Sequence, residues 1–280
     1  PRRLGLPAEA GAGPPSAGPP VPAAEGSLLE VGGLTRRFGG VTAVEDLRLR
    51  ADAGQVVSVI GPNGAGKTTA FNCVTGMIAP SAGTIVLAGR NVRGLAPHRV
   101  AAAGLARTFQ SIRLFEEMTV AENVLMGRFA RDRGLLRPLA RADLDAVRRC
   151  LDFTGLAGAA DRLAGGLAYG DRRRLEIARA LAGDPRVLLL DEPAAGANPT
   201  EKRALMELIA AISALGTAVV LIEHDVALVM SISDRVTVLE HGRTIAEGLP
   251  AEIQEDQRVI AAYLGVPDDP EPDLDAVVLR

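Results

Sequence analysis

A glycine-rich stretch in the first quarter of the chain constrains the fold more than any other feature. It follows the apolar run Val56–Ile60 and consists of Gly61-Pro62-Asn63-Gly64-Ala65-Gly66-Lys67-Thr68-Thr69. Strand, glycine loop and helix in that order form the P-loop pattern G-x-x-x-x-G-K-[ST]. Its glycines let backbone N–H groups close around phosphate oxygens, and the helix N-terminus adds positive charge. We therefore expect a bound nucleoside triphosphate, with Lys67 on its β- and γ-phosphates and Thr68 on Mg²⁺.

The length and charge of the chain disfavour several classes of protein. Its 280 residues suit one large α/β core with an insertion, and a net charge of -3 gives no overall basic field for nucleic acid. Only Cys73 and Cys150 are present, which argues against a disulfide framework and fits a reducing compartment. The longest uncharged run, Leu208 to Ile222, is about 15 residues, whereas a membrane-spanning helix needs roughly 20. We expect no membrane span, so any membrane role must come through a partner.

The composition predicts three further regions. Residues 1–27 are rich in Pro, Ala and Gly and lack the apolar segment of a signal peptide, so we expect a disordered leader. Between residues 111 and 182 the helical period dominates and a capping-box pattern begins at Thr119, which predicts a mostly helical subdomain inserted into the α/β core. Residues 266–280 are acidic and contain prolines, which predicts a loose tail.

Two carboxylates follow a buried strand in the second half of the chain. Val187–Leu190 is a continuous apolar run, and Asp191 and Glu192 come directly after it. Buried carboxylates are costly unless something uses them, and the carboxyl ends of parallel strands are where α/β sheets bind ligands. We expect Asp191 to hold Mg²⁺, directly or through water, and Glu192 to deprotonate the attacking water. The plain alternative is a helix-capping aspartate with an exposed neighbour.

Four more positions carry weaker signals. His224 follows the apolar strand Ala218–Ile222, which predicts a γ-phosphate contact rather than an ordinary surface histidine. Phe38 precedes two glycines and is either a core aromatic or a stacking platform for adenine. Gln110 ends the predicted strand 105–109, where an exposed glutamine is the plain explanation. The fourth signal is a short segment that precedes a predicted helix and is either a turn or a second anion site. It consists of Leu167, Ala168, Tyr169, Gly170 and Asp171.

Taken together, these motifs resemble those of the ATP-binding cassette (ABC) ATPases over nearly the whole chain, from about residue 28 to 265. The resemblance implies an α/β fold with a P-loop NTPase (RecA-like) core, an antiparallel β-subdomain and the inserted helical subdomain. It implies that Phe38 stacks on adenine, that 61–69 is Walker A, that Gln110 is the Q-loop residue sensing Mg²⁺ and water, and that His224 is the switch histidine. Residues 167–171 would be the signature loop, and 188–192 Walker B with its catalytic carboxylate.

Within this family the chain is most similar to the ATPase subunits of branched-chain amino acid importers. The similar segments are Arg107-Thr108-Phe109-Gln110, 112–115, 118–123, 191–199, 245–248 and 259–265. The resemblance implies ATP hydrolysis that powers amino-acid uptake through two separate membrane permease subunits and, indirectly, a periplasmic or extracellular solute-binding protein. The chain would sit peripherally at the cytoplasmic face of the membrane and stack head to tail with a second, homologous or paralogous, cassette. No nucleic-acid partner is expected.

The signature loop departs from the usual Leu-Ser-Gly-Gly-Gln of the family. Ala168 lacks the hydroxyl that normally meets the γ-phosphate, Tyr169 replaces the first Gly, and Asp171 replaces Gln. Contact with the partner's ATP must then depend on backbone N–H groups around Gly170 and on the helix start. One hypothesis is that the two sites of the dimer are unequal.

Three alternatives stay open. The cassette could serve export or another small solute such as urea, since the solute is selected by the membrane and binding-protein partners. It could be a soluble ABC ATPase acting on ribosomes or DNA, although a single cassette with negative net charge disfavours this. It could also be a regulatory cassette that only binds nucleotide, against which the intact residues Lys67, Asp191, Glu192 and His224 argue.

Overall fold

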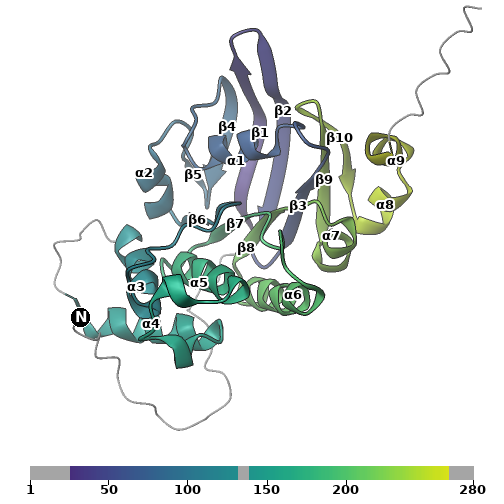
Figure 1. Ribbon diagram of the computed structural model, residues 1–280. Coiled ribbons are helices and arrows are strands. Elements are labelled where there is room, and N and C mark those ends of the chain that lie inside the picture. The colour runs from purple at the N-terminus through teal and green to yellow at the C-terminus, as the bar shows by residue number, and fades with distance from the viewer. Residues whose placement is uncertain (1–25, 132–138, 265–280) are drawn as a thin grey trace, which may run out of the picture.

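Two β-sheets share one core around the helix that follows the P-loop. The computed structural model describes residues 26–131 and 139–264, so the expected tail and the leader up to residue 25 lie outside the described residues. A four-stranded antiparallel sheet, in the order β2-β1-β4-β5, contains β1 (Ser27–Phe38), β2 (Val41–Asp52), β4 (Ala82–Leu87) and β5 (Arg90–Asn91). Buried residues of this sheet, of helix α1 (Lys67–Val74) and of one face of the second sheet form one hydrophobic cluster. Figure 1 shows how these elements are arranged.

The second sheet brings the predicted strand ends together. Its order is β10-β9-β3-β8-β7-β6, and its strands are β3 (Val56–Ile60), β6 (Leu105–Arg107), β7 (Val187–Asp191), β8 (Ala218–Ile222), β9 (Arg235–Glu240) and β10 (Arg243–Gly248). Strands β3, β7 and β8 are buried along their whole length, as their apolar runs predict. β8 pairs in parallel with both β3 and β7, so the carboxyl ends of all three lie at one edge.

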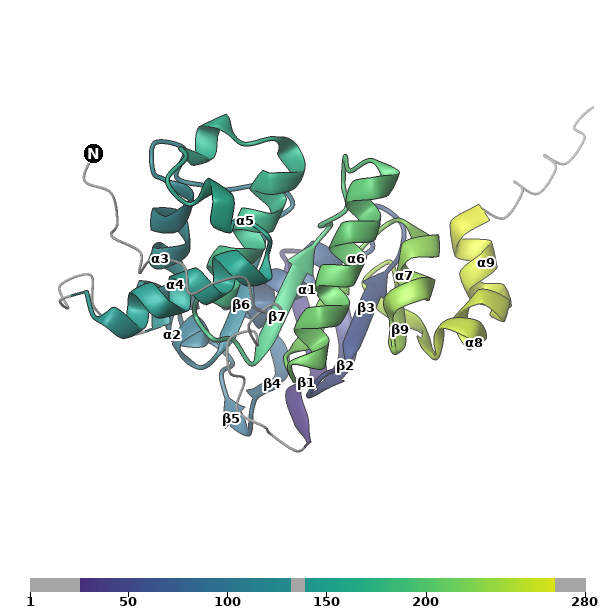
Figure 2. The ribbon, with the colours of Figure 1, turned by 90° about the horizontal axis from the view of Figure 1, so that it is seen from below.

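Helices cover the face of this sheet that lies away from the antiparallel sheet (Figure 2). The elements of the expected insertion are α3 (Val120–Arg131), α4 (Arg141–Phe153), the 3₁₀ turns η1 (Ala157–Ala159) and η2 (Ala164–Gly166), and α5 (Tyr169–Leu181). A second hydrophobic cluster joins α3, α4, α5 and α6 (Pro199–Ala214) to Leu188, Leu190 and Val219 of the sheet. A third cluster packs α7 (Val226–Ile232), α8 (Pro250–Glu255) and α9 (Gln257–Leu264) near β9 and β10, while α2 (Pro97–Ala102) flanks β6.

Local sequence signals place two helix starts correctly. The Thr119 Oγ1 accepts from the Glu122 N–H at 3.2 Å, and a Glu122 carboxylate oxygen accepts from the Thr119 N–H at 2.7 Å. Asn198 and Glu201 make the same reciprocal pair at the start of α6. The capping box predicted at Thr119 is therefore confirmed, and the sequence Asn198-Pro199-Thr200-Glu201 forms a second one.

The first hairpin is longer than the apolar pattern predicts. The apolar runs at 28–31 and 44–49 predict two short strands, whereas β1 and β2 run twelve residues each and pair from Ser27 to Phe38. Register shifts interrupt this pairing, so the alternation of buried and exposed residues breaks and the strands look shorter in sequence. The strand expected at 105–109 ends two residues early, at Arg107, because its last residues leave the sheet toward the Q-loop. Among the described residues no helix is long and apolar enough to cross a membrane.

Candidate functional site

The P-loop is a tight backbone cradle between the two sheets. Gly61 has φ 150, and a Cβ added there would lie 2.0 Å from the Leu239 carbonyl oxygen. Gly66, the N-cap of α1, has φ 97, and its Cβ would lie 2.3 Å from the Ala43 carbonyl oxygen. Both positions therefore require glycine, because side chains would collide with rigid backbone. The loop leaves the first amides of α1 free of side-chain caps, which suits an anion.

Lys67 lies buried within this cradle. Its Nζ donates to the carbonyl oxygens of Gly61 at 2.6 Å and Pro62 at 2.9 Å. Burial lowers the pKa of Lys67, while the nearby charges of Glu192 and Asp191 act in the opposite direction. The ammonium therefore stands close to the two carboxylates at the end of β7.

Asp191 is the last residue of β7 and is paired on one side only. Its Oδ2 accepts from Arg107 Nη2 at 2.6 Å, and both side chains are almost fully buried. Its Oδ1 is buried and has no hydrogen-bond partner among the described residues. A buried carboxylate oxygen without a partner is costly unless a ligand or water meets it.

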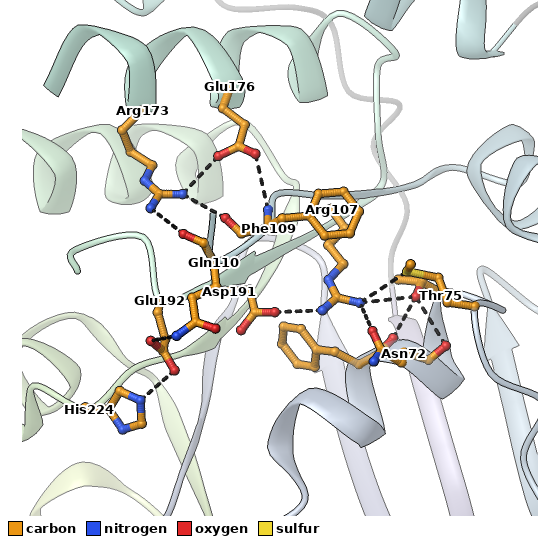
Figure 3. Close-up of polar contacts among 12 residues, drawn as sticks. Asn72, Thr75, Arg107, Phe109, Gln110, Arg173, Glu176, Asp191, Glu192 and His224 are labelled. Carbon is orange, nitrogen blue, oxygen red and sulfur yellow. Dashed lines mark hydrogen bonds and ion pairs between the residues drawn. The ribbon is translucent and has the colours of Figure 1, made fainter. Parts of the chain in front are cut away.

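Glu192 joins the other two predicted polar residues (Figure 3). Gln110 Nε2 donates to Glu192 Oε2 at 2.7 Å, and His224 Nε2 lies 2.5 Å from Glu192 Oε1. Glu192 has φ 47, in the left-handed region, and its N–H donates to the Ile222 carbonyl at the end of β8. Such a strained backbone costs roughly 1–3 kcal/mol and is concentrated at functional sites. The structure thus brings Gln110, Glu192 and His224 into one hydrogen-bonded group.

Glu223 supports the hydrogen-bonded group of Gln110, Glu192 and His224. The sequence motifs did not identify it. Its carboxylate accepts from the Ala194 N–H at 2.7 Å and the His224 N–H at 3.1 Å. Burial raises its pKa, whereas these backbone donors act in the opposite direction. Glu223 therefore connects the backbone just after Glu192 to the backbone at His224. Its place after a buried strand, beside His224, is the signal that could have identified it.

The buried ion pair of Arg173 and Glu176 holds the backbone of the Q-loop. The sequence motifs did not identify either residue. Arg173 Nη1 donates to the Phe109 carbonyl at 2.9 Å, and Nη2 donates to the Gln110 carbonyl at 3.1 Å. Glu176 accepts from Arg173 at 2.9 Å and from the Phe109 N–H at 3.3 Å. Burial raises the pKa of Glu176, although the Arg173 charge opposes this. Charged residues spaced i, i+3 on the buried face of a helix are the sequence signal for such a pair.

The signature loop (residues 167–171) packs against the segment that follows Glu192. Ala168 is the N-cap of α5 and makes no side-chain cap, so the helix amides are left to other partners. The Tyr169 hydroxyl donates to the Ala195 carbonyl at 2.6 Å, and a Cβ on Gly170 would lie 2.8 Å from a Glu201 carboxylate oxygen. Asp171 pairs with Arg174 at 2.7 Å, which offsets its negative charge. Leu167 is buried.

Phe38 lies at the β1–β2 turn, a few residues from the part of β2 that contacts the P-loop. It pairs with Val41 across the β1–β2 turn, and Ala43, two residues further on, is the residue whose carbonyl faces Gly66. Its ring is 43% exposed, and the Arg36 guanidinium lies 4.2 Å from its centroid. An aromatic ring with a free face near a phosphate loop can stack on a base.

The remaining loop residues differ in their exposure. Asn63, Gly64 and Thr68 are exposed, Thr69 is half-buried, and Ala65 is buried under the loop. Among the described residues, no group of three or more His, Cys, Asp or Glu side chains could hold a metal ion unaided. Mg²⁺ typically takes one or two protein ligands together with nucleotide phosphates and waters. The exposed Thr68 hydroxyl and the unpartnered Asp191 Oδ1 fit that arrangement.

Two family profiles match the sequence. The ABC transporter profile matches residues 44–195, which include the P-loop and the strand end at Asp191. The profile described as "Branched-chain amino acid ATP-binding cassette transporter" matches residues 243–269. Both matches agree with the resemblance found in the motifs.

Curated relatives and solved structures agree with the profiles. The chain is 48% identical to the high-affinity branched-chain amino acid transport ATP-binding protein BraF of Pseudomonas aeruginosa, over 85% of this chain and 98% of that protein. It is 48% identical to LivG of Escherichia coli, which bears the same description, with the same coverage. A crystal structure of an ABC transporter ATP-binding cassette in its ADP conformation superposes with a TM-score of 0.79 at 28% identity, covering 86% of this chain and 99% of that one.

These comparisons confirm the expected α/β P-loop NTPase fold and the ATPase activity general to the family. Matches cover the core of the chain and its C-terminal segment alike. The chain therefore belongs to the ABC transporter family as an ATP-binding cassette, within the group of branched-chain amino acid ATP-binding cassette transporters.

Proposed function

We propose that this cassette hydrolyses ATP to power the uptake of branched-chain or related amino acids through separate membrane permease subunits. The observation that carries the ATPase part is the hydrogen-bonded group Gln110–Glu192–His224 at the carboxyl ends of strands that adjoin the P-loop strand. The solute class is supported by the names of BraF and LivG and by the profile match at 243–269. The ABC ATPase domain comprises residues 28–265, with the helical subdomain inserted at 111–182.

In this account each residue performs one step of positioning or proton transfer. Lys67 neutralises charge on the β- and γ-phosphates, and the P-loop amides hold them. Glu192 accepts the proton of the attacking water, because each of its carboxylate oxygens keeps a second lone pair besides the one directed at Gln110 or His224. His224 donates to that carboxylate, because an ionised Glu can only accept, and it steadies the γ-phosphate. Gln110 orients the water beside Glu192.

Asp191 and Thr68 would hold Mg²⁺, with Gln110 close by. The metal, when bound, supplies charge neutralisation at the phosphates. Asp191 Oδ1 is the protein oxygen best suited to it, because Oδ2 is occupied by Arg107. Phe38 stacks on the adenine.

Two surfaces support the proposed partners. The signature loop of a second, homologous or paralogous, cassette completes the ATP site head to tail, with Gly170 and the start of α5 facing the phosphates. A groove beside the Q-loop receives a cytoplasmic loop of a permease subunit; its apolar lining includes Met77, Val100, Leu105, Phe109, Phe115 and Met126. A partner seated there touches Phe109, next to Gln110. This attachment holds the cassette at the cytoplasmic face of the membrane, and a solute-binding protein acts on the opposite side.

Transport in a reconstituted system tests the proposal. The full chain is co-expressed with its cognate permease subunits, second cassette and binding protein, and the complex is placed in liposomes. ATP-dependent uptake of radiolabelled leucine, isoleucine or valine is expected, with no uptake of urea. Lys67→Ala should abolish both ATP turnover and uptake. ATP turnover without uptake of any branched-chain amino acid, or with uptake of urea, would refute the proposed solute class.

A further inference from the structure

Arg107 connects three parts of the candidate site. Its side chain is 6% exposed and lies at the end of β6. Nη2 donates to Asp191 Oδ2 at 2.6 Å, and Nη1 donates to Asn72 Oδ1 at 2.6 Å (Figure 3). The guanidinium carbon lies 5.6 Å from the centre of the Phe71 ring and 5.1 Å from that of Phe109. The guanidinium is thus held by the P-loop helix α1 and by the Q-loop while it pairs with the carboxylate at the end of β7.

This ion pair determines which oxygen of Asp191 remains available. Oδ2 accepts from Arg107, whereas Oδ1 has no hydrogen-bond partner among residues 26–131 and 139–264. The guanidinium is planar, and its second terminal nitrogen is bound to Asn72, so its orientation is fixed. Rotation of the carboxylate would break a charged hydrogen bond in buried surroundings, which is costly. One oxygen of Asp191 is therefore kept free.

We propose that Arg107 is a positioning residue for Asp191, which holds the carboxylate so that Oδ1 stays available to the Mg²⁺ that accompanies the nucleotide. The inference rests on the proposed metal-holding role of Asp191. Groups that orient a metal ligand typically change metal affinity by about 10- to 100-fold when they are removed. Arg107 also lines the docking groove, so a partner seated there touches the residue that orients Asp191.

The positive charge of Arg107 acts against metal binding, whereas its positioning of Asp191 favours metal binding. A guanidinium near a bound cation repels it, so a role through charge alone predicts tighter metal binding when Arg107 is removed. The geometry favours orientation, because both terminal nitrogens are bound and because removal would leave Asp191 Oδ2 buried without a partner. The sign of the change in metal affinity therefore separates the two effects.

The proposal is tested without turnover by measuring Mn²⁺ binding to the full chain at saturating ADP. The EPR signal of free Mn²⁺ gives the unbound fraction. Arg107→Met is expected to weaken Mn²⁺ binding about tenfold. Arg107→Lys should restore it only in part, because an ammonium lacks the planar fork. Asn72→Ala releases one side of the guanidinium and leaves Asp191 intact, so a smaller weakening is expected. Arg113→Met is the matched control, with unchanged affinity, since Arg113 lies over the Phe109 ring at 4.7 Å rather than against Asp191.

Each outcome decides between explanations. Unchanged or tighter Mn²⁺ binding in Arg107→Met, or full restoration by Arg107→Lys, would overturn the proposal. If Asp191→Asn leaves Mn²⁺ binding unchanged, the metal role of Asp191 fails. If Asp191→Asn weakens binding while Arg107→Met and Asn72→Ala do not, only the positioning role fails. ADP affinity measured in EDTA checks that each variant is folded, and Asn72→Ala decides the question if Arg107→Met does not fold.

Discussion

The Tyr169 hydroxyl donates a hydrogen bond to the Ala195 carbonyl at 2.6 Å, which joins the signature loop to the segment just after Glu192. The usual family sequence has glycine where this chain has Tyr169, so the bond depends on a departure from that pattern. In the proposed head-to-tail dimer, it connects the loop that faces the partner's ATP with the loop that carries Glu192, the proposed catalytic carboxylate. Under that proposal the two ATP sites of the dimer are linked within each chain.

Tyr169→Phe tests this link. The substitution keeps the ring and removes the bond to Ala195, together with a long contact of 3.5 Å that the hydroxyl accepts from Arg173 Nη2. The loss of the shorter bond is worth about 1 kcal/mol, or roughly fivefold in rate if the bond is needed in the transition state. We expect ATP turnover in the assembled complex to fall by about that factor, with unchanged ATP affinity. Steady-state kcat and equilibrium nucleotide binding measure the two quantities. Turnover equal to that of the unmodified protein would remove any catalytic role from this bond.

Arg173→Met tests the clamp on the Q-loop. The guanidinium holds the carbonyl oxygens of Phe109 and Gln110, so its loss should let Gln110 move away from Glu192. A displacement of about 1 Å at a catalytic group can cost roughly 100-fold, so kcat should fall 10- to 100-fold while ATP still binds. Arg203→Met, at an exposed position on α6, is the control. A rise in KM with unchanged kcat would contradict the positioning role.

Glu176 makes stability depend on pH. Its pKa is raised above the ordinary value of 4.5, mainly by burial, so the folded state binds this proton more tightly than the unfolded state does. The stabilisation is complete below pH 4.5 and is lost as pH rises through the raised pKa. Urea unfolding should be measured from pH 4 upward for the unmodified protein and for Glu176→Gln. As the pH rises, the free energy of unfolding of the unmodified protein should fall relative to that of the variant. A difference that stays constant with pH would contradict the raised pKa.

Asn198→Ala tests the second capping box. The Asn198 side chain accepts from the Glu201 N–H at 3.0 Å at the start of α6. Loss of an asparagine N-cap costs about 1 kcal/mol of stability. Urea denaturation should show a decrease of that size, and Asn198→Asp, which keeps the acceptor, should restore most of it. An unchanged free energy of unfolding in Asn198→Ala would show that the cap contributes nothing.

Residues with local signals were predictable from the sequence. The P-loop, the strand end at Asp191 and the capping boxes each depend on neighbouring residues, and the parallel strands bring Glu192 and His224 together as their positions after apolar runs suggest. Residues that act through tertiary contacts were not predictable. Arg107 meets Asp191 across 84 positions of the chain, and Arg173 meets Phe109 across 64, so no local pattern announces either contact. The length of the first hairpin was not predictable either, because register shifts interrupt the alternation of buried and exposed residues.

The central claim is that Glu192, held by Gln110 and His224, activates the water that attacks ATP. The most direct measurement is ATP turnover beside ATP binding for Glu192→Gln in the assembled importer. Glutamine fills the same space but cannot accept the proton, and general-base catalysis contributes roughly 10²- to 10⁴-fold. The account predicts unchanged ATP binding and a loss of turnover of about that size. Turnover equal to that of the unmodified importer would contradict it.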